Sequence, residues 1–293
     1  MTGVFLLTLR ELRARWIVVG LFAVATLVWL VLALALQLDV VDGTLAGARL
    51  FGESAVDDPG SESGAGSAAG DGPPSVPFGA DSLLEGMVFG AQAFAAGAAY
   101  WVGILLALFA TGGLVASFQT RGEIDLLLSK PLARWQLLLG RLAGVWAVSL
   151  GLLVYLIGAV WLVMSVKSGI WAPRFLLAIP TIWLMFVVLY GIVAFVSVAT
   201  RSSALSLMVV LAVVFASLVL AIPELESQLR PVWRPVVAGL RHALPRFPTV
   251  GAQAVPQLAT GQPVTGLGAL ASSAAIGAVL YALSFWRFAR RDY

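Results

Sequence analysis

The chain of 293 residues contains no cysteine, a single histidine and only two lysines, and each shortage excludes a kind of site. Without cysteine there is no thiol catalysis, no iron–sulfur ligation and no disulfide. The one histidine, His242, excludes zinc motifs that need two histidines. Neither Lys130 nor Lys167 follows a glycine, so a phosphate-binding loop ending in Gly-Lys-Ser/Thr is absent. We therefore expect no catalytic residue, metal site or cofactor on this chain.

Charge is scarce as well. Only 11% of the residues are charged and 60% are hydrophobic, with a mean hydropathy of +0.96. This composition is typical of an integral membrane protein. Apolar runs of about 20 residues can cross a hydrocarbon core about 30 Å thick, and in lipid such runs form helices. The sequence predicts an all-α protein with six transmembrane helices, at residues 16–38, 97–118, 142–166, 175–199, 204–222 and 266–286.

The six predicted spans contain no Asp, Glu, Lys, Arg or His. Ion-coupled transporters and proton relays need ionisable groups at membrane depth, where such groups persist only for function. We therefore expect the energy for any transport to come from another chain. The uncharged spans suit lipid-like cargo, but plain contact with the bilayer is the simpler explanation of their composition.

Basic residues are unequally divided between the two sides of the predicted topology. With a cytoplasmic N-terminus, eleven of the eighteen basic residues lie inside and seven lie in much longer outer loops. The positive-inside rule therefore favours both termini in the cytoplasm, and we expect a multi-pass protein of the cell (inner) membrane. The pI of 9.6 follows from this topology and requires no nucleic-acid partner.

The sequence predicts one transmembrane permease domain over 1–293. Several segments of this domain lie outside the spans. Residues 1–15 are amphipathic and predict an interfacial helix. The outer loop 39–96 has a flexible middle at 52–72, rich in Gly, Ser and Ala, followed by a short interfacial helix at 82–94. A second outer segment covers 223–265.

The loop 119–141, between the second and third predicted spans, is longer than a simple turn requires. Gly122 can begin a short helix, with Glu123 in its first turn, where the helix dipole favours a carboxylate. Pro131 disfavours helical geometry at Lys130 and ends this helix. A short helix on the wet side of a membrane indicates a docking element for another protein. A helix lying among lipid headgroups fits the same pattern almost as well.

In the second outer segment, three arginines recur at roughly helical spacing beside an apolar stripe. Pro235 predicts that a regular helix begins only after it. One interpretation is an interfacial helix whose arginines reach anionic headgroups of the lipid bilayer. The other is a docking or gating cap that holds an outer-face protein or an anionic cargo group. Under either interpretation the contact residues are Arg230, Trp233, Arg234 and Arg241.

Three short motifs resemble those of ABC-2-type transporter permeases, in the branch that contains the permease subunit of nitrous-oxide-reductase maturation. They are Leu-Arg-Glu-Leu-Arg at 9–13, Leu-Leu-Leu-Ser-Lys-Pro-Leu-Ala-Arg at 126–134 and Phe-Ala-Arg-Arg-Asp-Tyr at 288–293. The six spans with both ends inside complete the resemblance, which covers essentially the whole chain in layout.

The resemblance implies the permease subunit of an ATP-binding-cassette exporter, paired with a second permease as a homodimer. Two copies of a separate ABC ATPase subunit, carrying ATP and Mg, would drive it to move a substrate or to transmit force across the membrane. In that family the loop between the second and third spans is a coupling helix that docks into the ATPase. By position this implies docking residues Gly122, Glu123, Leu127, Lys130, Pro131 and Arg134. The alternative is a passive membrane scaffold or anchor subunit of a larger complex, without ATPase coupling.

Overall fold

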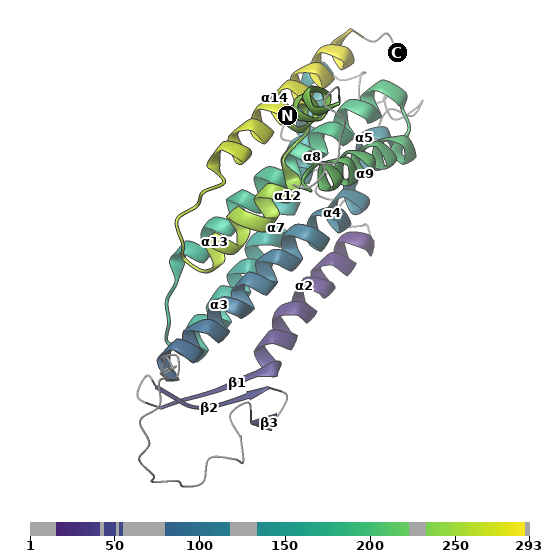
Figure 1. Cartoon of the computed structure of the whole chain (residues 1–293). Helices are drawn as coiled ribbons and strands as arrows, with labels where there is room; N and C mark the ends of the chain where they lie inside the picture. Colours follow the sequence, from purple (N-terminus) through teal and green to yellow (C-terminus); the bar gives the residue numbers. More distant parts are fainter. Residues whose placement is uncertain are drawn as a thin grey trace, which may run out of the picture.

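The computed structural model describes residues 16–41, 44–50, 53–54, 80–117, 134–222 and 233–290. Long helices run side by side in these ranges, with a small sheet at one end (Figure 1). Five helical segments are long and apolar enough to cross a membrane: Glu85–Ala116, Trp135–Ser168, Pro173–Thr200, Ser203–Leu220 and Leu267–Ala289. These helices confirm five apolar helical segments at the predicted second to sixth spans.

The predicted first span, 16–38, corresponds to α2 (Trp16–Ala35). Its apolar stretch, Val18–Leu34, is shorter than the other five, so the count of six spans stays a prediction. Side chains tie α2 to α7 (Arg134–Ser168), because the hydroxyl of Tyr155 accepts a hydrogen bond from Trp29 Nε1 at 3.1 Å. The predicted interfacial helix at 1–15 lies outside the described residues.

The second span begins earlier than the sequence predicts. It runs without interruption through α3 (Ala80–Ala98), the π-helix η1 (Ala99–Gly103) and α4 (Ile104–Thr111), with the short α5 (Leu114–Ser117) after it. No proline lies between Ala80 and Thr111 to end the helix. One continuous helix therefore replaces the predicted interfacial helix at 82–94 and a span starting at residue 97.

The third span belongs to α7, a helix of 35 residues. At 1.5 Å per residue this is about 52 Å, well beyond the hydrocarbon thickness. The excess length accommodates basic residues near both ends, Arg141 at the start and Lys167 at the finish. Lys167 Nζ donates a hydrogen bond to the carbonyl of Ala33, which fastens the end of α7 to the end of α2.

The centre of the bundle is α8 (Ala178–Thr200), which follows the 3-10 helix η2 (Pro173–Leu177) and packs against α9 (Ser203–Leu220) and α14 (Leu267–Ala289). A glycine allows the close approach of α14 to α8: a Cβ on Gly277 would lie 3.2 Å from the Cα of Val188. The Tyr281 hydroxyl donates to the Val187 carbonyl at 2.7 Å and accepts from Trp146 Nε1 at 3.2 Å.

A three-stranded antiparallel sheet follows α2, in the order β1 (Leu36–Val41), β2 (Thr44–Leu50) and β3 (Glu53–Ser54). It lies at the end of the bundle opposite the last turn of α14 (Figure 1). The sheet and the start of α3 occupy part of the predicted outer loop, so the all-α prediction describes the spans and omits this sheet. Within the predicted flexible middle, only Glu53–Ser54 is described.

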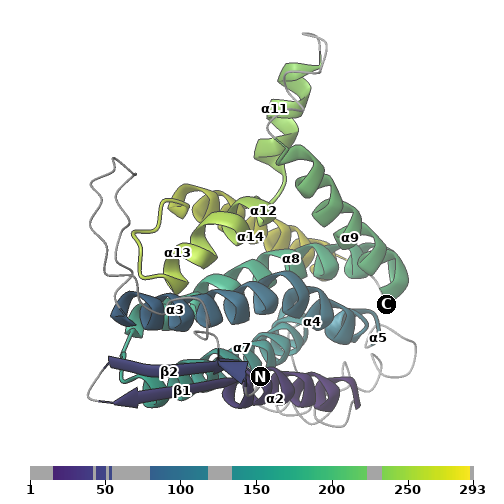
Figure 2. The same ribbon diagram turned by 60° about the horizontal axis from the view of Figure 1, so that its bottom comes forward.

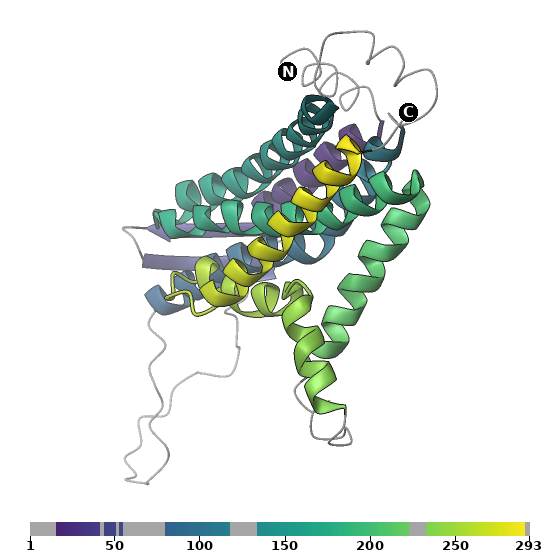
Figure 3. The ribbon, with the colours of Figure 1, turned by 90° about the horizontal axis from the view of Figure 1, so that it is seen from above.

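The second outer segment contains the predicted helix, as α11 (Arg234–Ala243), and a packed stretch after it that was not predicted. This stretch consists of α12 (Phe247–Thr249), the π-helix η3 (Val250–Ala254) and α13 (Val255–Ala259). In Figures 2 and 3, α11 projects from the bundle beyond the end of α9. The stretch from α12 to α13 instead turns back and packs against α3 and α8, with these residues buried: Phe247, Pro248, Val250, Gly251, Ala254, Val255, Leu258 and Ala259.

Candidate functional site

The predicted ATPase-docking residues fall mostly in 118–133, outside the described residues. These are Gly122, Glu123, Leu127, Lys130 and Pro131. Only Arg134 is placed, as the first residue of α7. The docking role of the loop therefore stays a prediction from sequence.

The predicted outer-face helix is present as α11. It begins at Arg234 with Pro235 in its first turn, two residues before the predicted start after Pro235, because proline is tolerated in the first turn of a helix. Arg230 lies outside the described residues. Three apolar side chains of this region are exposed: Trp233 by 57%, Val236 by 56% and Leu240 by 45%. The predicted apolar stripe thus includes an exposed face, which we call the α11 apolar face and define by these three residues.

Arg241 makes an internal contact. Its Nε and Nη2 donate to the carbonyl of Leu220, at 3.0 and 2.6 Å. Leu220 is the last residue of α9, where carbonyl groups lack partners within the helix and a cation is favoured. Arg241 therefore joins α11 to the end of α9, a structural role that the sequence prediction of an outer-face contact did not include.

A cavity of about 410 Å³ lies beside this contact. We call it the basic pocket, because two arginines from different parts of the chain line it. The backbone N–H of Arg246 donates a hydrogen bond to Ser273 Oγ at 3.0 Å. The buried Nε of the same residue makes no hydrogen bond to any described residue. The lining consists of Ser217, Leu220, Ala221, Arg241, Leu244, Pro245, Arg246, Pro248 and Thr249.

No carboxylate belongs to that lining, and none occurs in the described ranges 134–222 and 233–290. The sequence prediction missed Arg246 as a site residue. A signal was available: Arg246 stands between Pro245 and a Phe-Pro pair, in a short stretch that cannot continue the preceding helix.

An aromatic cluster holds the stretch Phe247–Ala259, which we call the returning segment, against the second span. The hydroxyl of Tyr100, on η1, donates to the Phe247 carbonyl at 2.6 Å, and their rings stack with centroids 4.6 Å apart. Trp101 meets Phe247 edge-on at 5.2 Å. Gly251 lies against these rings, so a Cβ there would be 2.4 Å from Tyr100 Cε1. This contact fixes α12, η3 and α13 against the middle of the second span.

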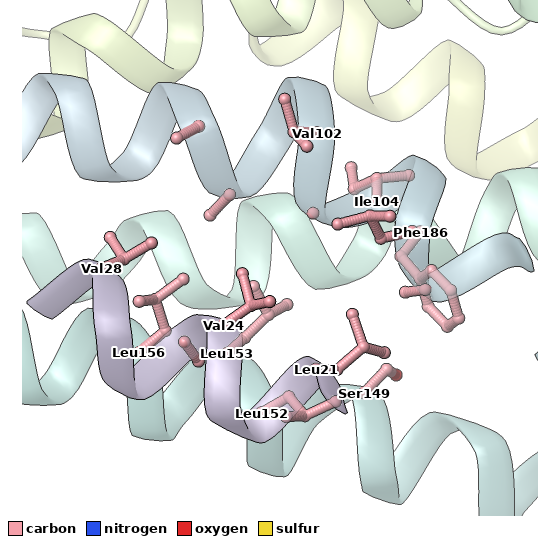
Figure 4. Close-up of a pocket in the computed structure, with 16 residues that line it drawn as sticks. Leu21, Val24, Val28, Val102, Ile104, Ser149, Leu152, Leu153, Leu156 and Phe186 are labelled. Carbon is pink, nitrogen blue, oxygen red and sulfur yellow. The ribbon is translucent and has the colours of Figure 1, made fainter. Parts of the chain in front are cut away.

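A second cavity, of about 210 Å³, opens between α2, the second span, α7 and α8 (Figure 4). Its walls are aliphatic and aromatic apart from Ser149, whose hydroxyl donates to the Trp146 carbonyl at 3.0 Å. In Figure 4, Val24 and Val28 of α2 lie beside Leu153 and Leu156 of α7, and Val102 of the second span lies on the opposite side. Such a cavity can hold an apolar group and offers no acid, base or nucleophile.

Two further observations concern polar side chains outside the two cavities. Gln92 on α3 is fully buried, and neither atom of its amide is hydrogen-bonded to a described residue. In the part of the chain that the structure describes, no three His, Cys, Asp or Glu side chains gather closely enough to hold a metal ion.

The comparison with protein families gives one result. A family model described as ABC-2 family transporter protein matches residues 9–293, nearly the full length of the chain. No curated protein matches the chain. Together with the apolar helices, the family match makes this a multi-pass membrane protein of the permease type. The chain belongs to the ABC-2 family of transporter proteins.

Proposed function

We propose that this chain is the transmembrane permease subunit of an ATP-driven exporter, with the ATPase on a separate subunit. Two permease chains, as a homodimer, would associate with two ATPase copies. ATP binding and hydrolysis with Mg on those copies would move the 119–141 loop and rearrange the spans. The observation that carries the proposal is the ABC-2 family match over 9–293.

Two features of the chain support the assignment of ATP hydrolysis to a separate subunit. The sequence has no Gly-Lys-Ser/Thr motif for its own nucleotide hydrolysis. In the five membrane-length helices, Asp, Glu, Lys, Arg and His residues occur only toward the ends: Glu85, Arg141, Lys167, Arg174 and Arg287. A transporter without ionisable groups at mid-membrane depth needs an energy source other than an ion gradient.

The proposal predicts that an ABC ATPase remains associated with the chain. We would purify the tagged full-length chain from its native membrane in mild detergent, then assay hydrolysis of Mg-ATP and identify the associated subunits by mass spectrometry. The expected result is a stoichiometric subunit with a Gly-Lys-Ser/Thr phosphate-binding loop and hydrolysis that vanadate inhibits. An intact complex that contains other proteins but no such subunit would instead support the scaffold or anchor function.

The orientation has its own test, because the chain has no native cysteine. Single substitutions Ser61→Cys and Ser67→Cys in the outer loop should react with an impermeant maleimide added to intact cells. Ser129→Cys in the loop between the second and third spans should react only after the membrane is permeabilised. Labelling of S129C in intact cells would reverse the proposed orientation, with both termini then outside.

A further inference from the structure

We propose that the basic pocket binds the phosphate group of an anionic membrane lipid, and that Arg246 makes the principal contact. The proposal concerns this pocket alone and does not depend on coupling to an ATPase. It rests on three observations: an orphaned donor on Arg246, two positive charges with no carboxylate among the described residues of the lining, and the position of the pocket at the end of a membrane-length helix.

The first observation is the Nε of Arg246, which is buried and makes no hydrogen bond to a described residue. A guanidinium has five N–H donors and no acceptor, so only an acceptor from outside the side chain can satisfy it. The residue is held in place, because its backbone N–H bonds to Ser273 Oγ at 3.0 Å and Pro245 precedes it. Arg246 also lines the basic pocket, so its guanidinium is positioned beside any anion bound there.

The second observation is charge. Arg241 contributes another guanidinium to the lining, oriented by its two bonds to the Leu220 carbonyl. The hydroxyl-bearing residues Ser217 and Thr249 add polarity to the wall, and the described residues of the lining include no acid. Guanidinium groups match the geometry of phosphate oxygens through paired N–H···O bonds. The cavity of about 410 Å³ is within the common range for small-ligand sites, about 300–1,000 Å³.

The third observation identifies a lipid as the source of the phosphate. The 18 residues of α9 span about 27 Å, close to the hydrocarbon thickness of about 30 Å. Leu220 ends this helix and lines the pocket, which places the pocket at the level of lipid headgroups. Leu244, Pro245 and Pro248 line it as well, so one part of the wall is apolar.

The test compares Arg246→Gln with Arg287→Gln in the purified full-length protein. Both variants remove one positive charge, but Arg287 is exposed on α14 and does not line the basic pocket. Binding of fluorescent phosphatidylglycerol would be measured by anisotropy in a neutral detergent, with fluorescent phosphatidylcholine as the reference lipid. We expect R246Q to weaken phosphatidylglycerol binding about tenfold, equivalent to about 1.4 kcal/mol, and R287Q to leave it nearly unchanged.

Equal binding by R246Q and the unmodified protein would overturn the proposal, as would equal loss in R246Q and R287Q. Unlabelled inorganic phosphate is the second arm: if it binds as tightly as the lipid does, the pocket recognises a soluble anion and the lipid assignment is wrong. If R246Q fails to give a monodisperse protein, Arg246→Lys replaces it, because lysine keeps the charge and lacks the paired N–H donors of a guanidinium. Undiminished phosphatidylglycerol binding by R246K would then contradict recognition through those paired donors.

Discussion

Gly251→Ala is expected to destabilise the protein more than any other single methyl addition at a described glycine. Its new Cβ would lie 2.4 Å from Cε1 and 2.8 Å from Cδ1 of Tyr100, and 2.8 Å from Cζ2 of Trp101. Tyr100 is fully buried, and its stacking on Phe247 together with the 2.6 Å bond to the Phe247 carbonyl prevents a simple displacement. The ring cannot move aside without breaking that hydrogen bond.

The cost has two parts. Overpacking a well-filled core costs about 1–3 kcal/mol, and leaving a buried donor or acceptor without its partner costs about 1–3 kcal/mol more. We therefore expect a loss of about 2–6 kcal/mol, seen as a drop of roughly 5 °C or more in the apparent Tm of the detergent-solubilised protein. Scanning fluorimetry on the intrinsic tryptophans would measure it.

Gly158→Ala is the matched control. It adds the same methyl group to a helix, α7, at a position where a Cβ would meet nothing within 4 Å. Alanine has the higher helix propensity, so the control should be neutral or more stable by up to about 1 kcal/mol. Equal Tm values for the two variants would show that the returning segment is not tightly held against Tyr100.

A double-mutant cycle tests the cause. In a Tyr100→Ala background the added methyl group no longer meets the tyrosine ring, so Gly251→Ala should cost much less than in the unmodified protein. An unchanged cost would locate the strain elsewhere, for example against Trp101.

The spans were predictable from the sequence because hydropathy over about 20 residues reports a property of the whole segment. The helix α14, Leu267–Ala289, differs from its prediction of 266–286 by only one residue at the start and three at the end. The predicted ends of a span differ from those of the structure where no residue in the sequence marks the membrane interface. The start of the second span is an example: helical geometry continues from Ala80 through Gly86 and Gly90 without a break.

The returning segment could not be recognised in the same way. Phe247–Ala259 is short and is interrupted by Pro248, Gln253, Pro256 and Gln257, so its hydropathy does not resemble that of a span. Its burial depends on Tyr100, which lies 147 residues away in sequence from Phe247. A contact of that separation is tertiary, and no local period encodes it.

The arginines illustrate the same limit. Helical spacing correctly places Arg234 and Arg241 on one helix, but it cannot reveal that Arg241 bonds to the Leu220 carbonyl, 21 residues earlier. Arg246 belongs to no helical repeat, so the periodicity of the sequence did not identify it as a site residue. Its interest comes from the cavity that α9, α11 and α12 form around it.

Pro131→Ala and Glu123→Ala should each reduce ATP-driven activity of the assembled complex while membrane insertion stays normal. Both residues lie in the predicted coupling loop 119–141, and neither falls in a predicted span. A minority of interface residues carry most of the binding energy and cost more than about 1 kcal/mol each when truncated. If both residues belong to that minority, ATPase binding should weaken by about tenfold.

A purely local role for Glu123 predicts a different outcome. Its carboxylate in the first turn of a helix would contribute only about 0.3–1 kcal/mol through the dipole, which changes ATPase affinity little. The discriminating variant is Glu123→Asp, which keeps the charge at the helix start and shortens the side chain. If E123D and E123A both bind the ATPase and support hydrolysis normally, the side chain of Glu123 has no coupling role; if E123D alone is normal, the charge itself is required. Normal activity in P131A as well would leave the loop as an interfacial helix, because a docking helix that ends at Pro131 should lengthen and shift when that proline is removed.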